Sequence, residues 1–255
     1  MTLNKKYILI TRPIEQADYL SRLILDNDGI SVKFPTIDIQ PLDKTKELIA
    51  NFNNIKDSDI LIFISRNAVR VAVDRFITDI NMFKNIKIIG VGSGTMGELE
   101  KSNFKNIIYS EQSDSEGVLN LSDMQSEKIK SKKIFIIRGV GGRELLVKGL
   151  KERGADVECI EIYKRCLTKY NKNQLDKLWY KRKPDAAIVT SNDILDNLTN
   201  ILKDDKKQLL STPLIVMSDR IAEYARNIGF ISKISIVKEK SDDGIFQCLL
   251  KLVGD

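Results

Sequence analysis

The sequence contains no histidine among its 255 residues. This absence excludes the usual general base, the usual zinc ligand and every Ser-His or Cys-His pair. Cysteine is also scarce, since Cys159, Cys166 and Cys248 are widely spaced and form no CxxC motif. We therefore expect a reduced, cytoplasmic protein with no bound metal.

Long apolar runs are absent as well. The longest strand-like runs are ILIFI and IFII, far short of the roughly 18 residues that a membrane span needs. The N-terminal stretch MTLNKKYILITRP is too short in apolar residues for a signal peptide. We expect neither a membrane segment nor a membrane partner.

Aromatic residues make up only 7% of the chain, and its basic residues form no cluster or arm. Nucleic-acid binding is therefore not expected, although the net charge is +6 and the pI is about 9.0. Two interpretations of this charge stay open. It is either a solvated lysine-rich surface or the counterpart of an acidic ligand.

What the sequence does contain is an internal repeat. The segment ILITRPIEQADYLSRLILDNDG from Ile8 corresponds to IFIIRGVGGRELLVKGLKERGAD from Ile134, with Arg12 over Arg138 at an offset of 126. The same offset places Ser65 over Ser191. Each half repeats an apolar strand, a short loop and an amphipathic helix. We predict a duplicated βα module.

Short apolar runs alternate with helical patterns in both halves, which is typical of a parallel α/β fold. The predicted strands of the first half lie near 7–11, 30–34, 59–64, 86–91 and 106–109, with helices near 15–27, 67–80, 95–103 and 115–123. The predicted strands of the second half lie near 133–138, 156–160, 185–189, 213–217 and 233–237.

Polar loops follow six of these strands, three in each half. An open parallel sheet binds ligands outside the carboxyl ends of its strands. We therefore expect two domains whose strand ends face one cleft. The loops are residues 11–13, 65–67, 92–95, 138–143, 190–192 and 218–220.

The loop RGVGGR at 138–143 is rich in glycine but matches neither G-x-G-x-x-G nor a P-loop. It is either a tight strand-to-helix turn or an anion site at a helix N-terminus. The serine loops are equally open. Ser65 or Asn67, and Ser191 or Asn192, are typical helix N-caps, yet hydroxyl and N–H groups at strand ends also suit carboxylates.

The segment IEIYKR at 160–165 alternates and follows a strand, and its counterpart in the first half is PTIDIQPL. Two extended segments at equivalent points can pair as a connector between domains. Tyr163 in this segment is either an amphipathic residue that packs a strand or a functional group.

Together these residues resemble the uroporphyrinogen-III synthase family. The resemblance covers most of the chain and rests on ILITRP at 8–13, SRNAV at 65–69, GVGSGT at 90–95, RGVGGREL at 138–145 and VECIEIYKR at 157–165. It implies two flavodoxin-like parallel-sheet domains joined by a two-stranded β-ladder. One domain would be discontinuous, residues 1–36 with 168–255, and the other would span 41–160, with paired linkers at 36–41 and 160–168.

The resemblance also implies a cofactor-independent, monomeric enzyme of heme and siroheme biosynthesis. The family closes hydroxymethylbilane, a linear tetrapyrrole with eight carboxylates, into uroporphyrinogen III with loss of water and inversion of ring D through a spiro intermediate. The glycine-rich loop would then face propionate or acetate groups rather than phosphate. The alternative is a non-catalytic two-domain module that closes a cleft on an acidic metabolite.

Tyr163 matches the tyrosine proposed as the acid in this family. One departure is Ile221, which stands where many members carry a threonine, so that a hydroxyl contact is lost there and Ser218 or Arg220 would replace it. The expected carboxylate contacts are Arg12, Ser65, Arg66, Asn67, Ser93, Thr95, Arg138, Gly142, Arg143, Thr190, Ser191, Ser218 and Arg220.

Overall fold

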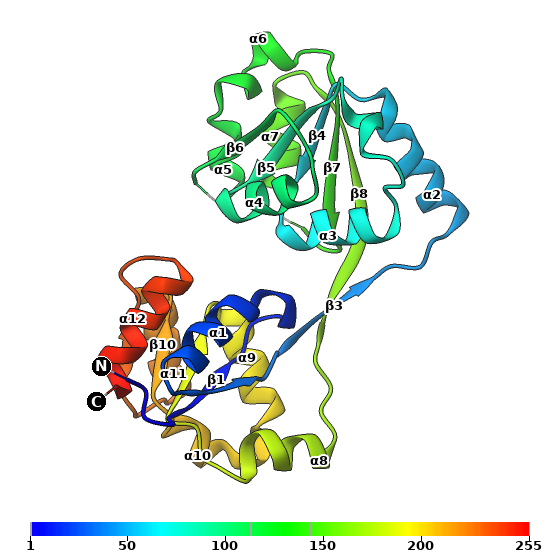
Figure 1. Cartoon of the computed structure of the whole chain (residues 1–255). Helices are drawn as coiled ribbons and strands as arrows, with labels where there is room; N and C mark the ends of the chain where they lie inside the picture. The colour runs from blue at the N-terminus through cyan, green and yellow to red at the C-terminus, as the bar shows by residue number, and fades with distance from the viewer. Residues whose placement is uncertain (1, 113, 143, 255) are drawn as a thin grey trace. The chain divides into compact units, whose positions relative to one another are not determined.

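The computed structural model describes residues 2–112, 114–142 and 144–254. They divide into two compact units: unit 1 combines the chain up to Asp38 with the chain from Cys166 onward, and unit 2 is Ile39–Arg165. Both boundaries fall inside strands, β3 (Ile37–Pro41) and β8 (Asp156–Leu167), which are hydrogen-bonded neighbours. The chain therefore passes between the units twice, through two adjacent strands (Figure 1).

Unit 1 is built on a five-stranded sheet in the order β11-β10-β9-β1-β2, and every pair in it is parallel. Numbered along the chain, this is the 2-1-3-4-5 order of flavodoxin-like folds. Its elements are β1 (Tyr7–Ile10), α1 (Asp18–Asp26), β2 (Ile30–Lys33), α8 (Lys172–Leu175), β9 (Ala186–Val189), α9 (Asn192–Ile201), α10 (Lys206–Leu210), β10 (Leu214–Val216), α11 (Asp219–Ile228), β11 (Ile234–Ile236) and α12 (Asp242–Val253).

Helices cover both faces of this sheet, which explains why its central strands are continuous apolar runs. All four residues of β1 and of β9 are buried. Ile8 and Ile10 share a core cluster with Leu20 of α1 and Leu249 of α12. Helices α9 and α11 contribute nothing to that cluster and pack on β9 and β10 instead.

Unit 2 is built on a six-stranded sheet in the order β3-β8-β7-β4-β5-β6, whose five strands from β8 to β6 are parallel. Its other elements are α2 (Lys46–Asn53), β4 (Ile60–Phe63), α3 (Arg66–Arg75), β5 (Lys87–Val91), α4 (Ser93–Lys101), β6 (Ile107–Ser110), α5 (Ser115–Leu119), α6 (Ser126–Ile129), β7 (Lys133–Gly139) and α7 (Leu145–Glu152).

Alternate residues of β4 divide between two cores in unit 2, as a strand with helices on both faces requires. Leu61 and Phe63 join the cluster that includes residues of α2, α3 and α4. Ile60 and Ile62 join the cluster that includes residues of α5 and α7. The register between β7 and β8 shifts by a bulge after Arg138, which sets Gly139 opposite Tyr163.

The strand orders of the two units correspond. In unit 2 the order β8-β7-β4-β5-β6 matches β2-β1-β9-β10-β11 of unit 1 when β7 takes the place of β1. These are the pairs that an offset of about 126 residues relates, although the duplication itself stays a prediction.

Three predicted helices differ from the observed ones. The helix expected over 15–27 starts only at Asp18, after a 3₁₀ turn that follows Pro13. The helix expected over 67–80 ends at Arg75, and a separate 3₁₀ turn follows at Ile80–Phe83, where the Asp79 carboxylate accepts from the Asn81 N–H. The helix expected over 115–123 breaks after Leu119 and resumes as a 3₁₀ turn at 122–124.

Two further features concern classes of protein raised above. Among the described residues, no helix combines the length and the apolar character needed to span a membrane. None of Cys159, Cys166 and Cys248, all of which the structure describes, is joined in a disulfide.

Candidate active site

In each sheet, one point separates two adjacent parallel strands from which the chain continues toward opposite edges of the sheet. In unit 1 this switch point lies between β1 and β9, and in unit 2 it lies between β7 and β4. Ligands of open parallel sheets bind outside the carboxyl ends of the strands at such points. Arg12, Ser191 and Ser65 lie in the loops that follow three of these strands, and Arg138 lies at the carboxyl end of β7 itself, at the strand ends that the sequence predicted.

A pair of hydroxyl groups lies at the switch point of unit 2. The Tyr163 hydroxyl is 3.0 Å from Ser65 Oγ, and either atom can donate. Ser65 is the N-cap of α3, and its Oγ accepts from the Ala68 N–H at 3.1 Å. The Tyr163 side chain is only 1% exposed and belongs to the core of the unit. Its ring therefore packs a strand, yet its polar end meets the predicted site.

Gly139 makes room for this ring. A Cβ atom at position 139 would lie 2.6 Å from Tyr163 Cε2 and 2.7 Å from Cζ, closer than atoms can pack. The first glycine of the loop thus accommodates the tyrosine ring because it has no side chain.

The rest of the glycine-rich loop folds around Arg138. The Arg138 side chain is 12% exposed and forms ion pairs with Glu144 at 2.9 Å and Glu161 at 3.2 Å. It also donates to the Gly142 carbonyl oxygen at 3.4 Å. Gly141 has a φ of +75°, a conformation that favours glycine. These contacts fit the tight-turn interpretation, because the cation is already paired within the chain. Arg143 lies outside the described residues.

A second cation of unit 2, Arg66, lies against the start of α4. Arg66, the first residue of α3, is exposed, and among the described residues it has no acidic partner. A Cβ atom at Gly94 would lie 2.4 Å from Arg66 Nε, so the guanidinium rests on the first turn of α4. This helix starts after Gly92, which has a φ of +82° and no side chain to cap it. Ser93 is exposed beside it.

Two predicted contacts of unit 2 are buried. Asn67 is 7% exposed and Thr95 is 4% exposed. The Thr95 hydroxyl donates to the Val91 carbonyl oxygen at 2.8 Å. Its counterpart Ile221 is 3% exposed. The isoleucine therefore lacks a buried contact with the backbone of this kind rather than an outward-facing hydroxyl.

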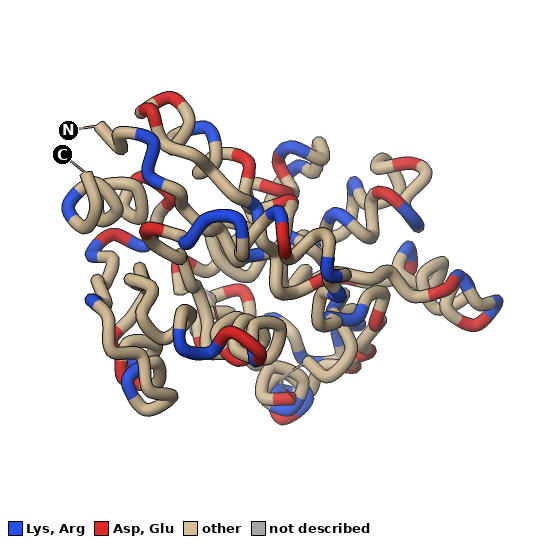
Figure 2. The backbone as a smooth tube through the Cα atoms, turned by 90° about the horizontal axis from the view of Figure 1, so that it is seen from below, with Lys and Arg blue, Asp and Glu red and all other residues tan. Residues whose placement is uncertain are grey.

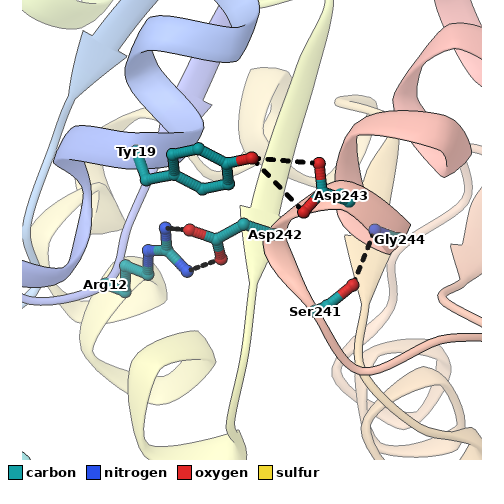
Figure 3. A network of polar contacts seen from close by, with 6 residues as sticks. All are labelled: Arg12, Tyr19, Ser241, Asp242, Asp243 and Gly244. Atoms are coloured by element: carbon teal, nitrogen blue, oxygen red, sulfur yellow. Dashed lines mark hydrogen bonds and ion pairs between the residues drawn. The ribbon is translucent and has the colours of Figure 1, made fainter. Parts of the chain in front are cut away.

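In unit 1, a network that the sequence did not predict encloses Arg12 (Figure 3). Arg12 donates from both terminal nitrogens to Asp242, at 2.6 and 2.8 Å, although 230 residues separate them. Beside this pair the Tyr19 hydroxyl donates to Asp243 at 3.2 Å, and this hydrogen bond raises the pKa of Tyr19. The acidic first turn after Ser241 is a recognisable helix start, but nothing in the sequence names its partner.

The remaining predicted contacts of unit 1 follow β9 and β10. Ser191 caps α9, accepting from the Ile194 N–H at 3.2 Å, and Thr190 beside it is half-buried. Ser218 is the N-cap of α11, but its side chain makes no capping hydrogen bond. Arg220 is exposed and has no acidic partner among the residues described.

The predicted loops lie at the carboxyl ends of the strands, several of them overlapping the first turn of the next helix, and the structure divides their side chains into two groups. Arg12 and Arg138 are engaged with carboxylates of the chain itself, and Asn67 and Thr95 are buried. The residues left half-buried or exposed at the strand ends are Ser65, Arg66, Ser93, Gly142, Thr190, Ser191, Ser218 and Arg220.

Charge and shape elsewhere add little to these sites. Basic and acidic residues are interspersed along the backbone (Figure 2). No group of three or more carboxylate and thiol side chains that could hold a metal ion occurs in the described part of the chain. A hollow of about 490 Å³ between Lys84 and Ile108 lies at the amino ends of β5 and β6, away from the carboxyl edge.

Comparison with known proteins identifies the family. The family model described as uroporphyrinogen-III synthase HemD matches residues 18–247. Uroporphyrinogen-III synthase of Escherichia coli K12 is 28% identical over 95% of this chain and 99% of its own length. The corresponding protein of Proteus mirabilis is 30% identical over 68% of this chain and 86% of its own.

Solved structures agree in fold. Uroporphyrinogen-III synthetase from Helicobacter pylori 26695 has a TM-score of 0.65 at 16% identity, covering 97% of this chain and 99% of that one. A mutant uroporphyrinogen III synthase from the extremely thermophilic bacterium Thermus thermophilus has a TM-score of 0.56 at 12% identity, covering 96% of this chain and 98% of that one. With a family model that matches nearly its whole length, the chain belongs to the uroporphyrinogen-III synthase family.

Proposed function

We propose that this protein is a uroporphyrinogen-III synthase that converts hydroxymethylbilane into uroporphyrinogen III with loss of water, as a lyase of tetrapyrrole biosynthesis. The observation that carries the proposal is the family match over residues 18–247. The hydroxyl pair of Tyr163 and Ser65 at a switch-point edge adds local support, because the reaction needs only a mild acid.

The first step expels the terminal hydroxyl of the substrate. The pyrrole nitrogen pushes electrons toward the carbon that bears the leaving group, and an azafulvene cation forms. A phenol hydroxyl is a mild acid that can supply a proton. We propose Tyr163 as the source of this acidity. Such a donor contributes about 10²–10⁴-fold to the rate.

The larger contribution comes from holding the flexible chain in one conformation. Ring D must attack the azafulvene carbon through its own substituted carbon to give a spiro intermediate, and a bound, oriented substrate makes this attack effectively unimolecular. Without that constraint the bilane closes to the symmetric type I isomer. The carboxylates of the substrate are the natural handles, and the exposed Arg66 and Arg220 and the N–H groups beside Ser93 and Ser218 are their proposed partners.

Arg12 and Arg138 have a different role in this proposal from the one that the sequence predicted. Because each already pairs with carboxylates of the chain, each shapes its loop rather than receiving a substrate carboxylate. We further propose that the protein works as a cytoplasmic monomer, without a cofactor and without nucleic acid.

One assay tests the function. The purified chain is supplied with hydroxymethylbilane, and the products are oxidised and separated by isomer. The type III isomer is expected in excess over the spontaneous type I isomer. A protein that only binds an acidic metabolite would leave the bilane to close as type I, and that result would reject the proposal.

A further inference from the structure

Tyr163 is enclosed too tightly to meet a substrate itself. Its side chain is 1% exposed and lies within the core cluster of unit 2. Its ring rests on Gly139 of the neighbouring strand. A group in this position can give up a proton only through another polar group beside it.

The direction of the hydrogen bond between the two hydroxyls follows from burial. Ser65 Oγ is the acceptor available to the Tyr163 hydroxyl among the described residues. If Ser65 donated instead, the phenolic proton would be buried without a partner, at a cost of about 1–3 kcal/mol. Tyr163 is therefore the donor and Ser65 the acceptor.

The hydroxyl proton of Ser65 then remains without a hydrogen-bond acceptor among the described residues. A serine hydroxyl has two acceptor sites and one proton. The Ala68 N–H occupies one acceptor site and Tyr163 occupies the other. The Ser65 proton has no acceptor of its own among the described residues, and Ser65 is half-buried at the carboxyl end of β4. This proton is directed out of the core, toward the edge where a ligand binds.

We propose that Ser65 is the residue that hands the proton to the departing hydroxyl, and that Tyr163 acts through it. This proposal rests on the proposed function and assigns its acid. As the C–O bond breaks, its electron pair leaves with oxygen, which takes the Ser65 proton and departs as water. The Tyr163 proton moves to Ser65 in the same event, so no serine alkoxide forms. The proton that the substrate releases when the macrocycle is complete returns to the phenolate through Ser65.

Comparison within the chain supports a special role for Ser65. Ser191 caps α9 in the same way, but at the position equivalent to Tyr163 unit 1 has Ile37. Capping therefore explains the serine in both units, whereas the phenol behind it occurs in one. A cap alone does not account for a tyrosine hydroxyl buried against Ser65.

Four variants test the relay. Ser65→Gly removes the hydroxyl. The loss of the N-cap costs only a few tenths of a kcal/mol, and the Tyr163 hydroxyl that loses its acceptor adds about 1–3 kcal/mol. Ser65→Thr keeps a hydroxyl and is the rescue. Tyr163→Phe removes the proton source, and the fourth variant combines Ser65→Gly with Tyr163→Phe. Thr45→Ala is the control, because Thr45 caps α2 of the same unit through the Leu48 N–H.

The measurement is single-turnover kinetics with hydroxymethylbilane, with KM and the type III fraction recorded beside it. Ser65→Gly and Tyr163→Phe should each lower the rate about 10²-fold or more with little change in KM. The double variant should be no slower than the slower single variant, because the two groups act as one unit. Ser65→Thr should recover most of the rate, and Thr45→Ala should change stability alone. In mixtures of H₂O and D₂O, the wild-type rate should follow a curve, the sign of two protons in motion.

Three outcomes would overturn the relay, and each differs from failure of the function. A near-normal rate for Ser65→Gly with a slow Tyr163→Phe would make Tyr163 the direct donor. A near-normal rate for Tyr163→Phe would remove the phenol from the chemistry. A straight D₂O dependence would show a single proton in motion. In all three the wild type still forms the type III isomer, whereas a wild type that forms only type I would reject the proposed function itself.

Discussion

The two units have equivalent loops at the carboxyl edges of sheets with the same strand order, but the hydroxyl group of the capping serine has different partners in each. In unit 2 the cap Ser65 also meets the buried Tyr163, whose ring fits over Gly139. In unit 1 the cap Ser191 has Ile37 at the corresponding position, and Pro13 corresponds to Gly139. Both units thus have the capping serine, whereas the hydroxyl pair also requires Tyr163 and Gly139, which only unit 2 has at these positions.

Charge is also divided unequally. Arg12 and Arg138 lie at the carboxyl ends of equivalent strands and the side chains of both are largely buried. Arg12 pairs through both terminal nitrogens with the single carboxylate of Asp242. Arg138 instead divides its nitrogens between Glu144 and Glu161. A bidentate pair fixes a guanidinium more firmly than two separate contacts do. The arginine of unit 1 thus pairs with helix α12, whereas the arginine of unit 2 pairs with Glu144, just after the glycine-rich loop, and with the neighbouring strand β8.

The exposed arginine occupies a different position in the sequence repeat of each unit. Arg66 starts α3 and rests on Gly94 of α4. The equivalent positions in unit 1 are Asn192 and Arg220, so the cation there belongs to the second helix. Each unit thus has one exposed arginine in the first turn of a helix that follows a strand of its sheet.

The largest expected effect comes from breaking the tie in unit 1. Asp242→Ala leaves the Arg12 charge, with a side chain 9% exposed, without its partner. Removing one member of such a pair costs about 3–5 kcal/mol. We expect a loss near the lower limit, about 3 kcal/mol, because the Asp242 side chain is 23% exposed. Urea unfolding followed by circular dichroism measures it.

Two controls accompany this variant. Combining Arg12→Met with Asp242→Leu should restore most of the stability, since an apolar pair avoids the desolvation of two charges. Glu152→Ala breaks the exposed pair with Lys148 and should cost less than about 1 kcal/mol. Equal losses for Asp242→Ala and Glu152→Ala would mean that burial does not strengthen the Arg12 pair.

The second effect concerns the fit between Gly139 and Tyr163. Gly139→Ala places a Cβ atom 2.6 Å from Tyr163 Cε2, in a core that cannot easily yield. Overpacking of this kind costs about 1–3 kcal/mol. The displaced ring should also lose its contact with Ser65 and lower kcat. Thermal unfolding and turnover are measured together.

A coupled variant decides whether the ring is the cause. In a Tyr163→Leu background, Gly139→Ala should cost much less stability than it does alone, because the ring that it meets is gone. Additive losses would place the strain elsewhere in the glycine-rich loop.

Much of the fold could be predicted from the sequence because its signals are local. The runs YILI, ILIF and AAIV are buried strands, as the sequence predicted. Ser65 after ILIF and Ser191 after AAIV are the N-caps of the helices that follow. Helix ends were less predictable. Helix α3 ends at Arg75 and a separate turn capped by Asp79 follows, and an acidic residue in a polar stretch does not by itself predict such a turn.

The candidate site was predictable by position and not by partnership. Arg12, Arg138 and Ser65 lie at the strand ends where the sequence placed them. Their partners depend on packing between distant segments, since 98 residues separate Ser65 from Tyr163 and 230 separate Arg12 from Asp242. A motif shows that an arginine follows a strand, but it does not show that a carboxylate of the same chain already occupies it.

The third effect concerns the exposed side chains of Arg66 and Arg220. Arg66→Ala and Arg220→Ala should each lower kcat/KM a few-fold with little change in stability, because an exposed ion pair is worth about 0–1 kcal/mol. Their effects should add, since they lie in different units. Both should weaken the decline of kcat/KM with salt between about 50 and 500 mM, over which the Debye length shortens several-fold. A wild-type kcat/KM that is flat across this range would show that charge does not guide the substrate.

The smallest effect isolates the placement of Arg66 from its charge. Gly94→Ala puts a Cβ atom 2.4 Å from Arg66 Nε, so the flexible guanidinium must move while its charge stays. The helix gains about 0.5–1 kcal/mol from alanine, so stability should not fall. We expect kcat/KM to fall as it does in Arg66→Ala, with no further loss when the two are combined. Gly97→Ala in the same helix meets nothing within 4 Å and should change stability alone. If Gly94→Ala keeps the wild-type kcat/KM while Arg66→Ala does not, the charge matters but its resting place on α4 does not.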